Sequence, residues 1–300
     1  MPGLRRRSDR LVLLLALLAS VSIQALEEGL PSKTAIYVLV ARAIGAKNPD
    51  PADRNPDYLA IQFLGPRERA ILTDYPVDAV DLDFEAALKR LPSAANVTTQ
   101  MTRTKFFDGA MLDAVRGGAT QVVVLGAGFD SRAYRFTTEL ARTRFFEVDS
   151  PPTQQYKIER VRQILPAIPS NVRYVPMDFT KDDLLTELKK AGYSESARTF
   201  FLWEGVTVYL PEAAVQATLH FVRDHSPARS TIAFDYQTSR NTDVNNPGSQ
   251  WARWGEPWIF GFPGDGAADY VKAQGLDVIS DSVNARRFGG NCIARVRRRG

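Results

Sequence analysis

The chain has 300 residues, 44% hydrophobic and 24% charged, which predicts one large α/β domain with additions, or at most two domains. Its one cysteine, Cys292, excludes an internal disulfide framework and a thiolate metal cluster. The formal charge of +4 comes from arginines near the two termini. Without eight of these and Asp9, 30 positive and 33 negative side chains remain, so the charge does not indicate a nucleic-acid partner.

Residues 1–25 form a distinct segment. Arginines between positions 5 and 10 precede an uncharged apolar run, Leu11 to Ala25, that ends in a small residue. This order is typical of a signal peptide, and it also permits membrane association through residues 11–25. About 15 apolar residues are few for a bilayer-spanning helix. A wrongly chosen start codon and a helix lying on a hydrophobic surface therefore stay open as alternatives.

Residues 26–300 are predicted to form a single domain, and its first part, residues 26–118, is predicted to be a helical cap. Helical apolar spacing predicts a helix over Lys33–Ala46 and a longer amphipathic helix over Val97–Arg116. The glycine pair that follows residue 116 is a strong signal for the end of a helix. Short helices are expected between residues 58 and 91.

The second part, residues 119–300, alternates strand and helix patterns. Strands are predicted at Gln121–Leu125, Thr143–Val148, Val172–Pro176, Thr199–Trp203, Ser230–Asp235, Leu276–Ser280 and Cys292–Val296, and helices at Arg132–Ala141, Thr153–Leu165, Lys181–Ala191 and Pro211–His225. This rhythm predicts a Rossmann-like α/β fold, with a mostly parallel seven-stranded sheet and helices on both faces. The last two strands have no clear helix between them, so they are expected to form an antiparallel edge hairpin.

A glycine turn follows the first strand and points to a nucleoside site. Gly126 and Gly128 allow the backbone to lie close to a ligand, and Asp149 ends the next strand, where it can bind both hydroxyls of a ribose. A dinucleotide site would have a third glycine where Ser131 stands, and Asp130 would repel a diphosphate. A carboxylate in this turn suits the ammonium and sulfonium of S-adenosyl-L-methionine instead. An ordinary βα loop with solvated acids is the alternative.

Two further strands also end in acidic residues. Asp178 follows the third strand and can accept the adenine amino group, while Phe179 or Met177 packs on the ring. Glu204 follows the fourth strand and is expected near the methionine end of the donor. Because parallel strands deliver their carboxyl ends to one edge of a sheet, we expect these acids to share a site with Asp149.

Seven motifs together resemble the leucine carboxyl methyltransferases and their bacterial S-adenosyl-L-methionine-dependent relatives. The motifs are SKTA (32–35), TRTKFFD (102–108), LGAGFDSRAYR (125–135), FEVDSP (146–151), MDF (177–179), WEGVTVYLP (203–211) and FDY (234–236). The resemblance covers about residues 32–236. It implies the class I methyltransferase fold and S-adenosyl-L-methionine as the methyl donor.

The resemblance also implies roles for particular residues. Arg103 and Lys33 would hold the carboxylate of the donor, and Gly126 would contact its methionine portion. Asp149 would bind the ribose, Asp178 and Phe179 the adenine, and Glu204 the far end of the donor. The apolar leader is foreign to this family. Location therefore stays open between the cytoplasm, where the donor is made, and export or anchoring.

The acceptor is expected to be a carboxylate or hydroxyl on a small molecule or peptide. A sulfonium methyl group is already activated, and an ionised carboxylate needs no base. The two histidines, His220 and His225, fall on or near the end of a helix away from the predicted ligand edge, which favours a carboxylate acceptor. An acid or a tyrosine such as Tyr209 could serve as the catalytic base for a hydroxyl acceptor. No zinc-type spacing appears in the sequence.

An aromatic segment late in the chain is a candidate lid. Residues 240–266 contain the run Trp251 to Gly266, rich in tryptophan, phenylalanine, glycine and proline. Arg253 could pair with an anionic substrate, with Trp254 beside it, although aromatic packing against the sheet explains the run equally well. Two other functions stay open at this point: a nicotinamide-dependent oxidoreductase, and a non-catalytic, membrane-tethered binding protein.

Overall fold

The computed structural model describes residues 31–178, 181–242, 248–284 and 289–297. The leader at residues 1–25 and the predicted adenine contact Phe179 lie outside these ranges, so both stay predictions. Within the described ranges, no helix has both the length and the apolar character needed to cross a membrane.

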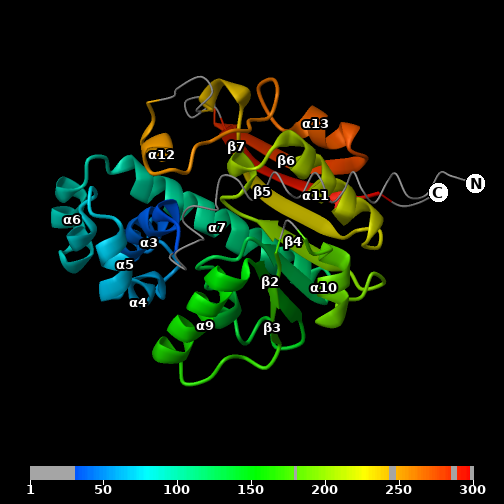
Figure 1. Ribbon diagram of the computed structural model, residues 1–300, viewed down its shortest axis with the longest axis horizontal. Helices are drawn as coiled ribbons and strands as arrows, with labels where there is room; N and C mark the ends of the chain where they lie inside the picture. The colour runs from blue at the N-terminus through cyan, green and yellow to red at the C-terminus, as the bar shows by residue number, and fades with distance from the viewer. Residues whose placement is uncertain (1–30, 179–180, 243–247, 285–288, 298–300) are drawn as a thin grey trace, which may run out of the picture.

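A seven-stranded sheet forms the centre of the molecule, in the order β3-β2-β1-β4-β5-β7-β6 (Figure 1). The strands are β1 (Gln121–Leu125), β2 (Arg144–Asp149), β3 (Val172–Pro176), β4 (Thr199–Trp203), β5 (Thr231–Gln237), β6 (Leu276–Asn284) and β7 (Gly289–Val296). The first five pair in parallel, and β7 pairs antiparallel with both β5 and β6. The predicted mostly parallel sheet and its antiparallel edge hairpin are confirmed. From β1 the strands follow in chain order toward β3 on one side, and from β4 they continue toward β5 on the other side. Sheets of this kind bind ligands at such a switch point, which here lies between β1 and β4.

Side chains alternate between two cores, one on each face of the sheet. On β1, Val122 and Val124 enter the core shared with the N-terminal helices, whereas Val123 and Leu125 enter the opposite core. This follows from the two-residue period of a strand, and because both faces are covered the whole of β1 is buried.

Helices cover both faces, as predicted. Those of the second part are α8 (Arg132–Arg135), α9 (Pro151–Ile164), α10 (Leu184–Lys190), α11 (Glu212–Asp224) and α13 (Ala268–Ala273), with a 3-10 turn η2 at Thr207–Tyr209. The predicted helix Arg132–Ala141 is wrong in length, because it ends at Arg135. Thr137 and Thr138 follow Phe136, and β-branched residues are poor helix formers. Arg132 and Arg135 also form buried ion pairs.

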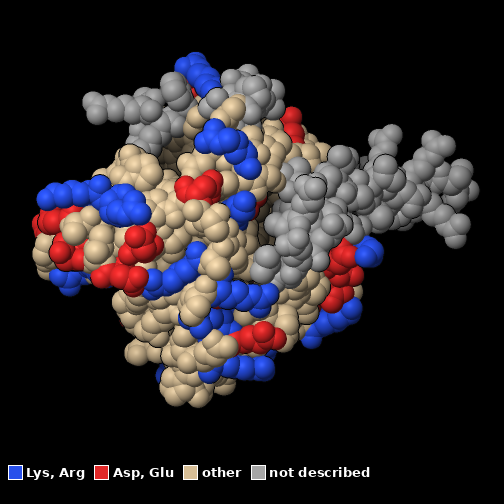
Figure 2. Space-filling view, turned by 60° about the vertical axis from the view of Figure 1, so that its left-hand side comes forward, with Lys and Arg blue, Asp and Glu red and all other residues tan. Residues whose placement is uncertain are grey.

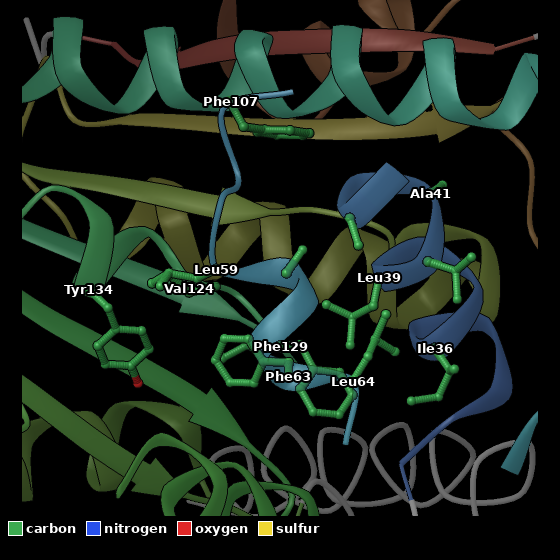
Figure 3. Close-up of a cluster of buried hydrophobic side chains, with 14 of the residues drawn as sticks. Ile36, Leu39, Ala41, Leu59, Phe63, Leu64, Phe107, Val124, Phe129 and Tyr134 are labelled. Carbon is green, nitrogen blue, oxygen red and sulfur yellow. The ribbon is translucent and has the colours of Figure 1, made fainter. Parts of the chain in front are cut away.

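The helices before residue 117 gather beside the sheet (Figure 1). They are α3 (Lys33–Gly45), α4 (Ala60–Phe63), α5 (Pro66–Ile71), η1 (Val77–Asp81), α6 (Phe84–Arg90) and α7 (Ala95–Arg116). Figure 3 shows Ile36 and Leu39 of α3 beside Phe63, which meets Phe129 of the glycine turn with ring centroids 5.6 Å apart. Apolar contact therefore seats these helices directly on the predicted ligand-binding turn.

Helix α7 runs antiparallel to the neighbouring strands. Near its C-terminal end, Gly117 accepts a hydrogen bond from Arg198, which precedes β4. Earlier in the helix, Arg103 lies 2.9 Å from Glu204, which follows β4. The N-terminal turns of α7 therefore project beyond the edge of the sheet at which the parallel strands end.

Candidate active site

A cavity of about 1910 Å³ lies at the carboxyl ends of the parallel strands. Its walls include the glycine turn after β1, the residues that follow β2 to β5, and one side each of α3 and α7. Pockets for single small ligands usually measure about 300–1,000 Å³. The volume of this cavity exceeds that of a usual single-ligand pocket.

The glycine turn closes around the carboxylate of Asp149. Gly126 and Gly128 have φ of 72° and 41°, and a Cβ on Gly126 would lie 2.8 Å from a Val206 methyl group. Asp149 accepts hydrogen bonds from the backbone N–H of Gly128 at 2.6 Å and of Ser150 at 2.7 Å. Each carboxylate oxygen retains a further lone pair, so the group can still accept two ribose hydroxyls.

Asp149 and Asp178 line the same cavity. Burial raises the pKa of Asp149, and the two backbone N–H donors oppose that rise. The side chain of Asp178 is 34% exposed, and its Oδ2 accepts a hydrogen bond from Lys181 Nζ at 2.6 Å. Met177, the alternative adenine contact, is buried and also lines the cavity. The adenine role of Asp178 stays a prediction.

The other two predicted acids, Asp130 and Glu204, are neutralised by arginines. Asp130 forms an ion pair with Arg132, and its Oδ1 accepts a 2.8 Å hydrogen bond from the Arg132 N–H. Glu204 pairs with Arg42, with Arg103 at 2.9 Å and with Arg132 at 2.8 Å. Burial opposes ionisation of Glu204, but the three guanidinium charges hold its pKa well below the usual range.

These pairs belong to one buried ionic network. Within the described ranges it joins four arginines to five carboxylates: Arg42, Arg103, Arg132 and Arg135 with Asp57, Asp108, Asp130, Glu204 and Asp235. Most of its members come from the sequence motifs that carry the family resemblance. The network connects the N-terminal helices to the strand ends, so these motif residues hold the two parts of the domain together.

Arg103 stands where the network meets the cavity. Its side chain is 16% exposed, lies 2.9 Å from Glu204 Oε1 and donates to Asp235 at 3.1 Å. Asp235 also accepts a 2.6 Å hydrogen bond from the Gly205 N–H. Asp235 lines the cavity although the sequence interpretation assigned it no role. Its place in the FDY motif, at the end of the fifth strand, was the available signal.

Tyr209 lines the cavity as a protonated phenol. Its hydroxyl accepts a hydrogen bond from Trp258 Nε1 at 3.3 Å. Burial and the nearby Glu256 charge raise the pKa of Tyr209 to about 12. At neutral pH the phenol therefore favours donating a hydrogen bond over acting as a base.

Residues 248–266 of the candidate lid form a lid segment that is attached to the start of α3. Glu256 accepts hydrogen bonds from Ser32 Oγ at 2.9 Å and from the N–H groups of Lys33 at 2.8 Å and Thr34 at 3.2 Å. A carboxylate at a helix N-terminus is stabilised by the unpaired N–H groups there. Ser32 and Thr34 of the SKTA motif therefore hold the lid, and both also line the cavity. The side chain of Lys33 is not among the cavity walls.

The aromatic residues of the lid segment divide between two roles. Trp251 and Trp258 line the cavity and stack with ring centroids 5.1 Å apart. Trp254 instead donates to Asp74 at 2.7 Å and packs on Tyr37, while Arg253 donates to the Gly248 carbonyl at 2.6 Å. Neither Arg253 nor Trp254 lines the cavity, so the structure does not bring these two predicted substrate residues to the site.

Comparison with known proteins identifies the family. The family model for leucine carboxyl methyltransferase matches residues 35–223, more than half of the chain. The chain belongs to the leucine carboxyl methyltransferase family. The predicted class I methyltransferase fold is confirmed by the strand order, and the interpretation as an S-adenosyl-L-methionine-dependent methyltransferase is confirmed at the level of the family.

Individual relatives of this leucine carboxyl methyltransferase family member carry the name of S-adenosyl-L-methionine-dependent methyltransferases. One from Mycolicibacterium gilvum is 31% identical over 207 residues, which cover 68% of this chain and 65% of the relative. One from Mycobacterium tuberculosis (strain H37Rv) is 32% identical over 226 residues, which cover 71% and 70%. The chain thus spans about two thirds of the length of these relatives.

Among solved structures, a "possible exported protein" from Bordetella parapertussis has a TM-score of 0.51 at 15% identity. The match covers 88% of this chain and 96% of the Bordetella chain, which shows a common fold. The nicotinamide oxidoreductase and the non-catalytic binding protein gain no support from these comparisons. In Figure 2, acidic and basic side chains are intermixed on the visible face of this family member. Within the described ranges, no group of three or more histidine, cysteine, aspartate or glutamate side chains could hold a metal ion.

Proposed function

We propose that the protein transfers the methyl group of S-adenosyl-L-methionine to an oxygen atom, a carboxylate or hydroxyl, of a small molecule or peptide. The observation that carries the proposal is that Asp149 and Asp178, from successive strand ends, line one cavity with the glycine turn. This arrangement fits an adenosine, with its ribose on Asp149 and its adenine beside Asp178. Family membership supports the choice of donor.

The methionine end of the donor fits the part of the cavity next to Arg103. Its guanidinium lines the cavity, 2.9 Å from Glu204 and 3.1 Å from Asp235, and it can bind the carboxylate of the donor. The Glu204 carboxylate then acts through Arg103, because it holds that guanidinium in place 2.9 Å away. This differs from the direct contact that the sequence resemblance implied for Glu204.

Methyl transfer requires alignment more than acid or base chemistry. The acceptor oxygen forms a bond to the methyl carbon while the carbon–sulfur bond breaks and its electron pair returns to sulfur. The protein has to hold the acceptor in line behind the methyl group and exclude water. A protonated Tyr209 can donate a hydrogen bond to a carboxylate acceptor, which needs no base. This supports a carboxylate over a hydroxyl acceptor.

The donor site is tested by replacing Asp149 with alanine. We expect binding of S-adenosylhomocysteine to weaken by about 100-fold, because both ribose hydroxyls lose a charged acceptor. Isothermal titration calorimetry measures the change. Asp113→Ala, an exposed aspartate near the end of α7, is the matched control and should bind normally. Wild-type affinity in Asp149→Ala would refute the assigned site.

The acceptor is found by a labelled-donor screen. The protein is incubated with cell extracts and donor carrying a labelled methyl group, and the labelled product is identified. A base-labile methyl ester is expected for a carboxylate acceptor, whereas a methyl ether would indicate a hydroxyl. Fluorescence titration with reduced nicotinamide cofactor, which should give no binding, separates the oxidoreductase alternative.

A further inference from the structure

Three large aromatic side chains form one wall of the cavity: Tyr37 of α3, Trp251 of α12 (Gln250–Arg253) and Trp258. Each of the three keeps part of its surface exposed. Trp251 and Trp258 stack with an interplanar angle of 13°, and the Tyr37 ring meets Trp251 edge-on with centroids 5.3 Å apart. Apolar surface that is open to a cavity gains the free energy of burial only when a ligand covers it. This aromatic wall (Tyr37, Trp251 and Trp258) is therefore a candidate surface for a ligand.

Backbone and side-chain contacts fix the aromatic wall relative to Tyr209. The N–H groups of Ile259 and Phe260, which follow Trp258, both donate to the Val208 carbonyl, at 2.8 Å and 3.1 Å. Val208 precedes Tyr209 in η2, and Trp258 Nε1 donates to the Tyr209 hydroxyl at 3.3 Å. The indole ring and the phenol hydroxyl therefore belong to the same part of the cavity. Because these contacts exist before any ligand binds, the wall is preorganised, which lowers the entropic cost of binding.

The same part of the cavity adjoins the methionine end of the proposed donor site. Gly205 lies shortly before η2, and a Cβ placed on it would be 3.8 Å from both terminal nitrogens of Arg103. Burial raises the pKa of Tyr209, and the Arg103 charge opposes that rise, so the two groups lie close together. A ligand group that accepts a hydrogen bond from Tyr209 is therefore beside both the proposed site of the donor carboxylate and the Trp258 indole.

We propose that the aromatic wall binds an aromatic ring of the methyl acceptor, and that this ring carries the accepting carboxylate directly or through a single carbon. Aromatic rings attract one another at centroid separations of about 4.5–7 Å, beyond the gain from apolar contact alone. The 3.3 Å between Trp258 Nε1 and the Tyr209 hydroxyl leaves room for few atoms between the ring and the carboxylate. The Glu256 carboxylate beside the wall is compensated by its donors at the start of α3. The inference rests on the proposed function and names the substrate class of the same site.

The first experiment compares the binding of benzoate with that of cyclohexanecarboxylate. The two probes have the same carbon skeleton and the same charge at neutral pH, and only benzoate is aromatic. Each is titrated against the full chain by ligand-observed NMR, with and without S-adenosylhomocysteine, whose own binding is measured by calorimetry. We expect benzoate to bind about fivefold tighter, the contribution of roughly one aromatic pair. Equal affinity, or no binding of either probe, would overturn the proposal. Failure to bind S-adenosylhomocysteine would instead contradict the proposed function, and the comparison of the two probes without it would still decide the role of the wall.

Two substitutions at Trp258 then separate its aromatic ring from its apolar bulk. Trp258→Phe keeps a ring, and we expect it to retain a preference for benzoate of at least about threefold. Trp258→Leu keeps only apolar bulk, and its preference should fall below about twofold. The matched control is Tyr58→Leu, which removes an exposed aromatic ring outside the cavity wall and should keep the wild-type preference. Melting temperatures show that each variant is folded. An unchanged preference in Trp258→Leu would overturn the proposal.

The labelled-donor screen gives an independent check on the same inference. An aromatic acid yields a methyl ester that absorbs in the near ultraviolet, so the labelled product can be followed by its radioactivity and its absorbance together. We expect the product isolated from extracts to carry an aromatic ring on the esterified carbon or on the carbon next to it. A labelled product without an aromatic ring would overturn the proposal.

Discussion

Two halves of the same sheet edge use their carboxylates differently. At the ends of β2 and β3, Asp149 and Asp178 face the cavity, with backbone N–H groups and an exposed lysine as partners. Around the ends of β1 and β4, Asp130 and Glu204 are enclosed by guanidinium groups. The sequence position of an acid at a strand end is therefore not sufficient to assign its role.

The difference arises from what packs above each half. Arg42 of α3 and Arg103 of α7 reach Glu204 from the N-terminal helices, and Arg132 reaches it from the turn after β1. A buried carboxylate is stable only when it is paired, so this half of the edge becomes the junction between the helices and the sheet. In the other half, the described partners of Asp149 and Asp178 include backbone N–H groups and Lys181, and this half is the proposed donor site.

The largest expected effect comes from breaking the junction with Arg132→Met. The Arg132 side chain is 1% exposed and pairs with Asp108, Asp130 and Glu204, so its loss leaves buried negative charges without a partner. We expect the free energy of unfolding to fall by about 3–5 kcal/mol, measured by urea denaturation. Arg116→Met, at an exposed ion pair on the same chain, should change it by less than about 0.5 kcal/mol. Wild-type stability in Arg132→Met would mean that the network does not hold the two parts together.

A smaller effect is expected from paired substitutions that separate the two halves. Asp178→Asn removes a charge facing the cavity, and we expect donor affinity to fall by about tenfold while stability is unchanged. Asp130→Asn removes a charge that pairs with the buried Arg132, so it should lower stability more than donor affinity. Calorimetry and thermal unfolding of both variants measure the contrast. The same response in both variants would contradict the division of the edge.

The smallest effect is expected from Tyr209→Phe, on the cavity wall between the lid and β4. With a pKa of about 12, the phenol stays protonated between pH 6 and 9, so the wild-type rate should not rise with pH through this residue. We expect the variant to lose about fivefold in rate, the contribution of one hydrogen bond of about 1 kcal/mol, with an unchanged pH profile. The measurement uses the acceptor identified by the labelled-donor screen. A wild-type rate that rises tenfold per pH unit, and a variant that loses this dependence, would identify Tyr209 as the base.

Much of the site could be placed from sequence because parallel strands deliver their ends to one edge. That rule brought Gly126, Asp149 and Asp178 into one cavity, as expected. The roles of Asp130 and Glu204 could not be read in this way, because their partners come from distant segments. Asp235 went unrecognised as well, because its partners Arg103 and Gly205 belong to α7 and to the segment after β4.

The sequence by itself determined the strands, their mostly parallel order and the position of the glycine turn, because local apolar periodicity and turn chemistry depend on neighbouring residues. The resemblance of its motifs also identified the family correctly. Only the tertiary structure decided which charges face the cavity and which face each other. Ion pairing acts across space between segments such as α3, α7 and the end of β4, and no spacing along the chain encodes those contacts.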